Sequence, residues 1–317
     1  MELEGRITRI DRGRALVAVG DEQHSVVDTG EHDLTVGDRV RFEGEALVEL
    51  LPRSSLLTRL GADGEPQPIA ANVDVVVVVA GLDRPVKAGR LLRATTQAWE
   101  AGSTPLIVLT KSDLEDPEPV IADLGVQLVG VDVLAVSSKT GNGMDDLRDR
   151  LAGRTAVLLG ESGAGKSSLI NALTEGDELV GEVRESDAKG RHTTTWRQLV
   201  DLPGGGALID TPGVRSLGLW ADAESVEAAF TDIADLAEHC RFRDCSHDSE
   251  PGCAVRAAVE DGSLAAERID QYHSLRREAE SLERRTDAHA EKQAGRRTGR
   301  MYKEAKAERR RKGDDSV

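Results

Sequence analysis

The sequence predicts a multi-domain fold: an N-terminal OB-like β-barrel, an α/β domain on a parallel sheet, and a helical C-terminal region. Short strand-like segments separated by turn residues fill positions 1–50, which is typical of a small barrel. From about residue 70, apolar runs alternate with helical segments, as in doubly wound α/β domains. After Trp220 the chain becomes polar and helical.

Four strands are expected in the barrel, at residues 5–10, 15–19, 25–27 and 38–43, within a domain of residues 1–55. Their spacing does not separate an OB-fold from an SH3-like barrel. OB-folds commonly bind RNA, but Phe42 is the only aromatic residue in this segment. Contacts with RNA would therefore depend on backbone and shape rather than on base stacking.

The α/β domain is predicted to span residues 56–220, and its first strand is the apolar run 73–81. Such a continuous run indicates a strand buried on both faces of a parallel sheet. A helix is expected at 88–100, with Gly102 able to cap its C-terminus. Further strands are expected at 106–109, 131–136, 156–159, 199–202 and 207–209, the last two paired across glycines 204–206.

A phosphate-binding loop follows the strand at 156–159. Residues 160–167, GESGAGKS, match the pattern GxxxxGK[ST] and lead into an apolar helix start. This context identifies a P-loop, in which backbone N–H groups wrap phosphates at a helix N-terminus. Lys166 is expected to reach the β- and γ-phosphates, and the Ser167 hydroxyl to ligate Mg²⁺. The loop alone does not separate GTP from ATP.

Two later segments would complete a site for nucleotide hydrolysis. Asp210, in the DTPG of residues 210–213, can hold Mg²⁺ through water, and the Gly213 N–H can meet the γ-phosphate. Between the P-loop and DTPG lies GRHTTT, residues 190–195. A threonine there would complete the Mg²⁺ shell in the GTP state. We predict Thr194, with Thr193 as the alternative.

Asp113 is the residue expected to select guanine. It ends the TKSD of residues 110–113, and its carboxylate can accept hydrogen bonds from guanine N1 and N2, donors that adenine does not present in that pattern. Thr110 stands where asparagine is commoner, a change expected to loosen one loop contact. The SSK of residues 137–139 resembles the SAK element that backs guanine O6.

The order of these motifs is circularly permuted. Ordinary GTPases run P-loop, switch threonine, DxxG, NKxD and SAK, whereas TKSD and SSK come first here. A parallel sheet tolerates this change because the loops after its strands meet at one edge whichever strand comes first. The predicted GTP-binding residues are Thr110, Lys111, Ser112, Asp113, Ser137, Ser138, Lys139, Gly160, Glu161, Ser162, Gly163, Ala164, Gly165, Lys166, Ser167, Ser168, Asp210 and Gly213.

Val214 occupies the position where many GTPases carry the glutamine that orients the attacking water. A valine cannot orient water, so slow intrinsic hydrolysis is expected unless a partner or His192 does so. A surface role for His192 without part in the reaction is the alternative. The predicted catalytic residues are His192, Lys166 and Thr194, with Mg²⁺ on Ser167 and Thr194.

All three cysteines lie in one cluster, Cys240-x4-Cys245-x-His247-x5-Cys253. Three thiolates and one imidazole suit a closed tetrahedral site, which predicts one structural Zn²⁺ in a helical domain of residues 221–285. Free buried cysteines are one alternative. His239 is an alternative ligand, although its adjacency to Cys240 makes the geometry poor.

Charge is distributed unevenly along the chain. The net charge is −16, yet residues 284–312 carry twelve Lys or Arg against four Asp or Glu, a net of +8. This asymmetry indicates an acidic body with a basic arm, suited to RNA phosphates. Residues 286–317 are expected to form a disordered basic tail, and a solvated helix with a ragged end is the alternative.

Composition excludes other classes of protein. Aromatic residues make up only 3% of the 317 residues, so the core must be aliphatic. No apolar run approaches the roughly 20 residues needed to cross a bilayer, and the first ten residues lack the apolar core of a signal peptide. We expect a cytoplasmic protein with no membrane partner, and a monomer, since nothing in the sequence demands more.

Together these motifs resemble those of the bacterial ribosome small subunit-dependent GTPase A (RsgA) family over nearly the whole chain. The resemblance includes the barrel, TKSD, GESGAGKSSLIN, GRHTTT, DTPG and CxxxxCxHxxxxxC. It implies a GTPase with a structural zinc that is stimulated by the 30S ribosomal subunit and acts in late maturation on its 16S rRNA. It also implies that His192 is the catalytic histidine. The barrel is short for this pattern, and the tail is longer and more basic than the motifs require.

The leading interpretation is an enzyme that docks on the small subunit with GTP and leaves with GDP after hydrolysis. A GTP-binding RNA scaffold for ribosome assembly, without significant turnover, is one alternative. A P-loop kinase or ATPase is another, which Asp113 disfavours.

Overall fold

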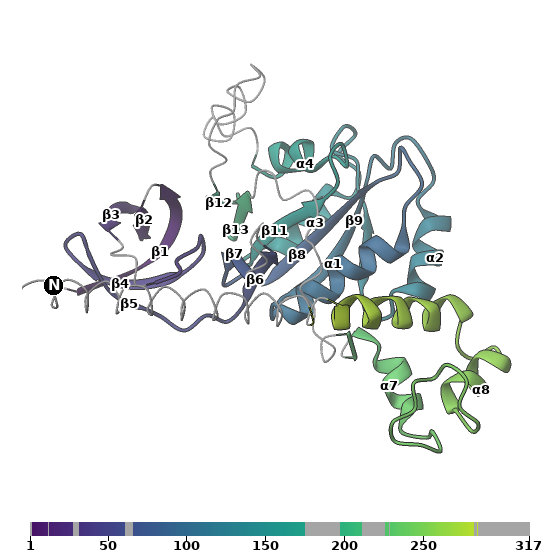
Figure 1. The fold of residues 1–317 in the computed structure, drawn as a ribbon. Helices are drawn as coiled ribbons and strands as arrows, with labels where there is room; N and C mark the ends of the chain where they lie inside the picture. Colours follow the sequence, from purple (N-terminus) through teal and green to yellow (C-terminus); the bar gives the residue numbers. More distant parts are fainter. Residues whose placement is uncertain are drawn as a thin grey trace, which may run out of the picture.

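The computed structural model describes residues 2–11, 13–27, 32–60, 66–174, 197–210, 226–227, 229–281 and 284. Figure 1 shows the three predicted parts in chain order: a barrel, a sheet covered by helices, and a small helical region. His192, Thr193, Thr194, Gly213 and Val214 lie outside the described residues.

Five strands form the N-terminal barrel: β1 (Glu2–Asp11), β2 (Arg14–Val19), β3 (Glu22–Val27), β4 (Arg39–Glu43) and β5 (Ala46–Leu50). Their order β1-β2-β3-β5-β4 closes because β4 also pairs with β1. The fifth strand was not among the four expected, since its residues ALVEL lack a strict alternation of apolar and polar side chains. Phe42 is fully buried in the barrel core and is not available for stacking on a base.

The central sheet has the order β10-β9-β8-β11-β13-β12. All neighbours are parallel except β12 and β13, which form the expected antiparallel hairpin. A single pairing, Arg9 opposite Gln198, joins β12 to β1 of the barrel. The strands are β8 (Val75–Gly81), β9 (Thr104–Thr110), β10 (Asp132–Ala135), β11 (Thr155–Gly160), β12 (Gln198–Asp201) and β13 (Ala207–Asp210).

Helices cover both faces of this sheet (Figure 1). One face carries α1 (Ala88–Glu100) and α2 (Glu118–Gln127), and the other carries α3 (Met144–Leu151) and α4 (Lys166–Leu173). Consecutive valines of β8 pack alternately on the two faces, which explains the continuous apolar run. The expected Gly102 cap is present, with φ +81° and its N–H bonded to Trp99 O.

A two-stranded hairpin of β6 (Leu56–Leu60) and β7 (Pro66–Ala71) packs beside the sheet. Neither segment is among the strands expected from the sequence. Pro66 and Pro68 argue against a strand because proline cannot donate to a ladder. They are tolerated here because β7 has one partner strand.

The C-terminal region contains α7 (Thr231–Ala237), α8 (Ala254–Glu260) and a helix over residues 266–281. Phe230, Ile233 and Tyr272 are buried and belong to the same apolar cluster as the α1–α2 face of the sheet. The region is therefore packed onto the α/β domain. Within the described residues, no helix has the length and apolar character to cross a membrane.

Candidate nucleotide site and metal centre

The predicted P-loop connects β11 to α4 at the carboxyl edge of the sheet. Gly165 precedes the helix with φ +94°, a conformation that glycine adopts without strain. A side chain here would also place its Cβ 3.0 Å from Thr110 Oγ1. Glycine thus lets the loop turn into α4 while lying against the TKSD segment.

Lys166 begins α4, and its side chain folds back over the loop. The ammonium donates to Gly160 O at 2.5 Å and to Glu161 O at 2.7 Å. Ser167 and Ser168 follow in the first turn of the helix. The loop, the amine and the helix N-terminus therefore meet at one place, as phosphate binding requires.

The TKSD segment contacts the P-loop directly, although the contacting residues are 54 and 52 positions apart in sequence. Thr110 Oγ1 donates to Ala164 O at 2.5 Å, and Lys111 Nζ donates to Gly163 O at 2.8 Å. Threonine was expected to loosen a loop contact. The structure corrects this expectation, because the Thr110 hydroxyl itself makes the hydrogen bond.

Asp113 and the SSK segment form a second corner of the site. Ser137, which is fully buried, donates from Oγ to Asp113 Oδ1 at 2.7 Å. Lys139 Nζ lies 3.7 Å from Asp113 Oδ2. Ser138 is the residue between Ser137 and Lys139 in the sequence. The Ser137 hydrogen bond, helped by a backbone hydrogen bond and then by the charge of Lys139, holds the pKa of Asp113 below its usual value. The carboxylate is thus ionised and oriented at the end of β9.

Asp210 ends β13, which pairs with β11, the strand that leads into the P-loop. The structure thus brings the P-loop, TKSD, SSK and Asp210 to one sheet edge despite their permuted order. Of the predicted catalytic residues, Lys166 is placed at the P-loop. His192, Thr193, Thr194 and Gly213 lie outside the described part of the chain.

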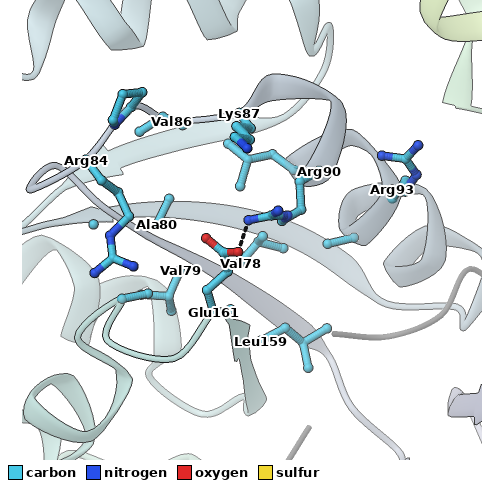
Figure 2. Close-up of a pocket in the computed structure, with 16 residues that line it drawn as sticks. Val78, Val79, Ala80, Arg84, Val86, Lys87, Arg90, Arg93, Leu159 and Glu161 are labelled. Carbon is cyan, nitrogen blue, oxygen red and sulfur yellow. Dashed lines mark ion pairs between the residues drawn. The ribbon is translucent and has the colours of Figure 1, made fainter. Parts of the chain in front are cut away.

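A basic pocket beside the P-loop was missed by the sequence analysis. Figure 2 shows this cavity of about 210 Å³, with an apolar lining from β8, β11 and α1. Four cations line it: Arg84, Lys87, Arg90 and Arg93. Arg90 forms an ion pair with Glu161 of the P-loop. These four cations recur at every third position after the apolar strand β8. That spacing is the sequence signal that could have revealed the pocket.

Cys240, Cys245, His247 and Cys253 form a cluster that could hold a metal ion. Their four ligand atoms all lie within 4.8 Å of one another. Cys240 Sγ and Cys253 Sγ are 3.9 Å apart, and His247 Nδ1 lies 3.6 and 3.5 Å from them. Thiolates on a tetrahedral zinc at its usual bond length are about 3.8 Å apart, so the geometry suits such an ion.

The surroundings of the cluster favour ligation. Burial lowers the pKa of His247, which keeps the imidazole neutral, the form that binds metal. Backbone N–H groups point at two sulfurs, from Ala254 to Cys240 and from Arg256 to Cys253. His239 is not part of the cluster, and its Nδ1 lies 3.1 Å from Asp235 O.

Comparison with known proteins gives a consistent result. The family model described as RsgA GTPase matches residues 50–220. A Streptomyces coelicolor protein named small ribosomal subunit biogenesis GTPase RsgA is 44% identical, over 91% of this chain and 83% of its own length. A protein of the same name from Xanthomonas axonopodis is 45% identical, over 78% of this chain and 69% of its own length.

Solved structures share the fold. YjeQ from Thermotoga maritima superposes with a TM-score of 0.69 at 26% identity, covering 88% of this chain and 99% of its own. YloQ, described as a circularly permuted GTPase, gives 0.68 at 27% identity, covering 89% and 96%. The permuted architecture predicted from the motif order is therefore confirmed.

Proposed function

This chain belongs to the RsgA GTPase family, and from that premise we propose that it binds the 30S ribosomal subunit with GTP, acts late in its maturation, and leaves after hydrolysis. The names of its relatives, small ribosomal subunit biogenesis GTPase, support the partner. The observation that carries the proposal is the convergence of the P-loop, TKSD and SSK at one sheet edge.

The nucleotide would lie across this edge. Lys166 and the N–H groups of the P-loop bind its phosphates, and Asp113 accepts hydrogen bonds from the guanine base. Ser167 and Thr194 would ligate the Mg²⁺ that accompanies GTP, which neutralises charge on the β- and γ-phosphates. Asp210 would hold the same ion through water. These residues orient the phosphates for attack by water.

Hydrolysis by the isolated chain is expected to be slow because Val214 supplies no polar group for the attacking water. We assign His192 to this role, with the ribosomal subunit favouring its productive position. Gly213 would contact the γ-phosphate and so distinguish GTP from GDP.

The Cys240–Cys245–His247–Cys253 cluster would hold one structural zinc. Its support is the donor set of three sulfurs and one nitrogen, which supplies all four ligands of a tetrahedral structural site. The ion would fix the loop between α7 and α8 and thereby the shape of a surface for rRNA. The basic tail of residues 286–317 and the barrel would add contacts to 16S rRNA backbone.

Co-sedimentation with purified 30S subunits tests the proposed cycle. The chain loaded with a non-hydrolysable GTP analogue should pellet with the subunits, and the chain loaded with GDP should remain in solution. Equal binding in both states would instead favour the RNA scaffold. Competition of ATP with GTP for the free chain would favour the kinase or ATPase alternative.

A further inference from the structure

Asp83 lies directly after β8, outside every motif of the sequence analysis, and connects two cations to the P-loop. Its Oδ2 lies 2.8 Å from Lys111 Nζ and 3.1 Å from Arg84 Nη2. Each cation in turn donates to a loop carbonyl. Lys111 Nζ is 2.8 Å from Gly163 O, and Arg84 Nη1 is 3.4 Å from Ser162 O. Figure 2 shows Arg84 at the edge of the basic pocket.

The carboxylate is ionised at neutral pH. Hydrogen bonds from Arg84 and then Lys111 lower the pKa of Asp83 to about 2. Lys111 depends on such support, because its φ of +63° is uncommon for a residue other than glycine. A backbone conformation of this kind persists only where surrounding contacts hold it. The two contacts of Lys111 Nζ, with Asp83 and with Gly163 O, are of this kind.

We propose that Asp83 is a positioning residue for guanine nucleotide binding. By holding Lys111, it fixes the TKSD segment against the P-loop. The part of the site that would bind the base then stays at a constant distance from the part that would bind the phosphates. A site that is already ordered loses less conformational freedom when its ligand binds. Asp83 itself touches no nucleotide in this account, which rests on the nucleotide site proposed above.

The Asp83–Lys111 pair differs from an ordinary surface ion pair. Exposed pairs contribute little because water screens them. The side chains of Asp83 and Lys111 are each about 30% exposed. The pair matters for nucleotide binding because Lys111 Nζ also contacts Gly163 O of the P-loop. Loss of the Asp83 carboxylate should therefore weaken nucleotide binding while leaving the fold intact.

A fluorescent N-methylanthraniloyl GDP titration of the full-length chain tests this. The variants are Asp83→Asn, Lys111→Ala, the double variant, and Asp132→Asn as control. Asp132 forms an exposed ion pair with Arg150 at the start of β10, away from the site. We expect Asp83→Asn to raise the Kd about tenfold through misplacement of the loop, with an unchanged melting temperature. The double variant should bind no more weakly than Lys111→Ala.

The outcomes are separable. A wild-type Kd for Asp83→Asn would overturn the inference, and so would effects of Asp83→Asn and Lys111→Ala that add independently. An equal weakening in Asp132→Asn would show a general charge effect and would also overturn it. If the wild-type chain does not bind the probe, the proposed nucleotide site itself is wrong, and the inference falls with it.

Discussion

Thr110 shows how one side chain adapts a common motif. Asparagine is usual at this position, yet the Thr110 hydroxyl lies 2.5 Å from Ala164 O and its Cβ sits against Gly165. The hydroxyl is a donor that ties the TKSD segment to the P-loop. The hydrogen bond is buried, so its loss leaves a carbonyl without a partner.

Thr110→Val should therefore weaken nucleotide binding. Valine keeps the shape of threonine but removes the donor, and we expect the Kd for GTP to rise about fivefold, as for one lost hydrogen bond of roughly 1 kcal/mol. Thr110→Ser is the matched control because it keeps the hydroxyl. Equal Kd values for the valine and wild-type proteins would show that this hydrogen bond does not matter for binding.

Residues of the site were predictable where a motif requires them in a fixed local order. The P-loop and TKSD are such cases, because loop and strand are adjacent in sequence. Asp83 was not predictable, since its partner Lys111 lies one helix and one strand further along and meets it only in the folded sheet. The Arg84–Ser162 contact depends on the same tertiary arrangement.

At the scale of elements, burial on both faces made the central strands easy to predict. The valine run of β8 has no period of two because both of its faces are covered. The elements that were missed break local rules. β7 contains two prolines, and β5 lacks alternation, so pairing with a neighbouring strand decided both.

The metal cluster organises the segment between α7 and α8. Cys253 is also the N-cap of α8, where its sulfur accepts from the Arg256 N–H. A cation bound here would couple this helix start to Cys240, which follows α7, and removing it should disorder both ends.

Metal content of purified variants tests this element. Cys245→Ser should lower zinc from about one per chain to near zero, because a closed site needs all four ligands. His239→Ala is the matched control, since His239 lies outside the cluster, and it should retain the metal. Loss of zinc from His239→Ala, with retention in His247→Ala, would show that His239 rather than His247 is the fourth ligand.

At the scale of the whole molecule, Arg268 joins the C-terminal region to the α/β domain. Its side chain is 3% exposed and forms two hydrogen bonds of 2.9 Å with Asp232. It also donates to Gln127 O at the end of α2 and stacks 4.0 Å from the Phe230 ring. One guanidinium thus joins its own helix to α2 and to α7.

Arg268→Ala should lower the free energy of unfolding by about 3–5 kcal/mol, since it leaves Asp232 without its partner in a largely buried place. Arg256→Ala removes an exposed pair with Glu260 and should cost less than about 1 kcal/mol. Urea denaturation of both variants compares the two. Similar midpoints for them would mean that Arg268 does not anchor the region.

The proposed function requires a nucleotide site that hydrolyses GTP rapidly only when the 30S subunit is bound. Figure 1 shows the barrel and the C-terminal region on either side of the α/β domain. A surface made of all three parts could bind one large partner and report its presence to the nucleotide. The slow hydrolysis proposed for the free chain would be the counterpart of that arrangement.

The most direct test is the rate of GTP hydrolysis with and without purified 30S subunits, alongside Lys166→Ala. We predict slow turnover by the free chain, an increase of at least about tenfold with 30S subunits, and loss of both in the variant. Turnover that 30S subunits leave unchanged, or that survives in Lys166→Ala, would contradict the account.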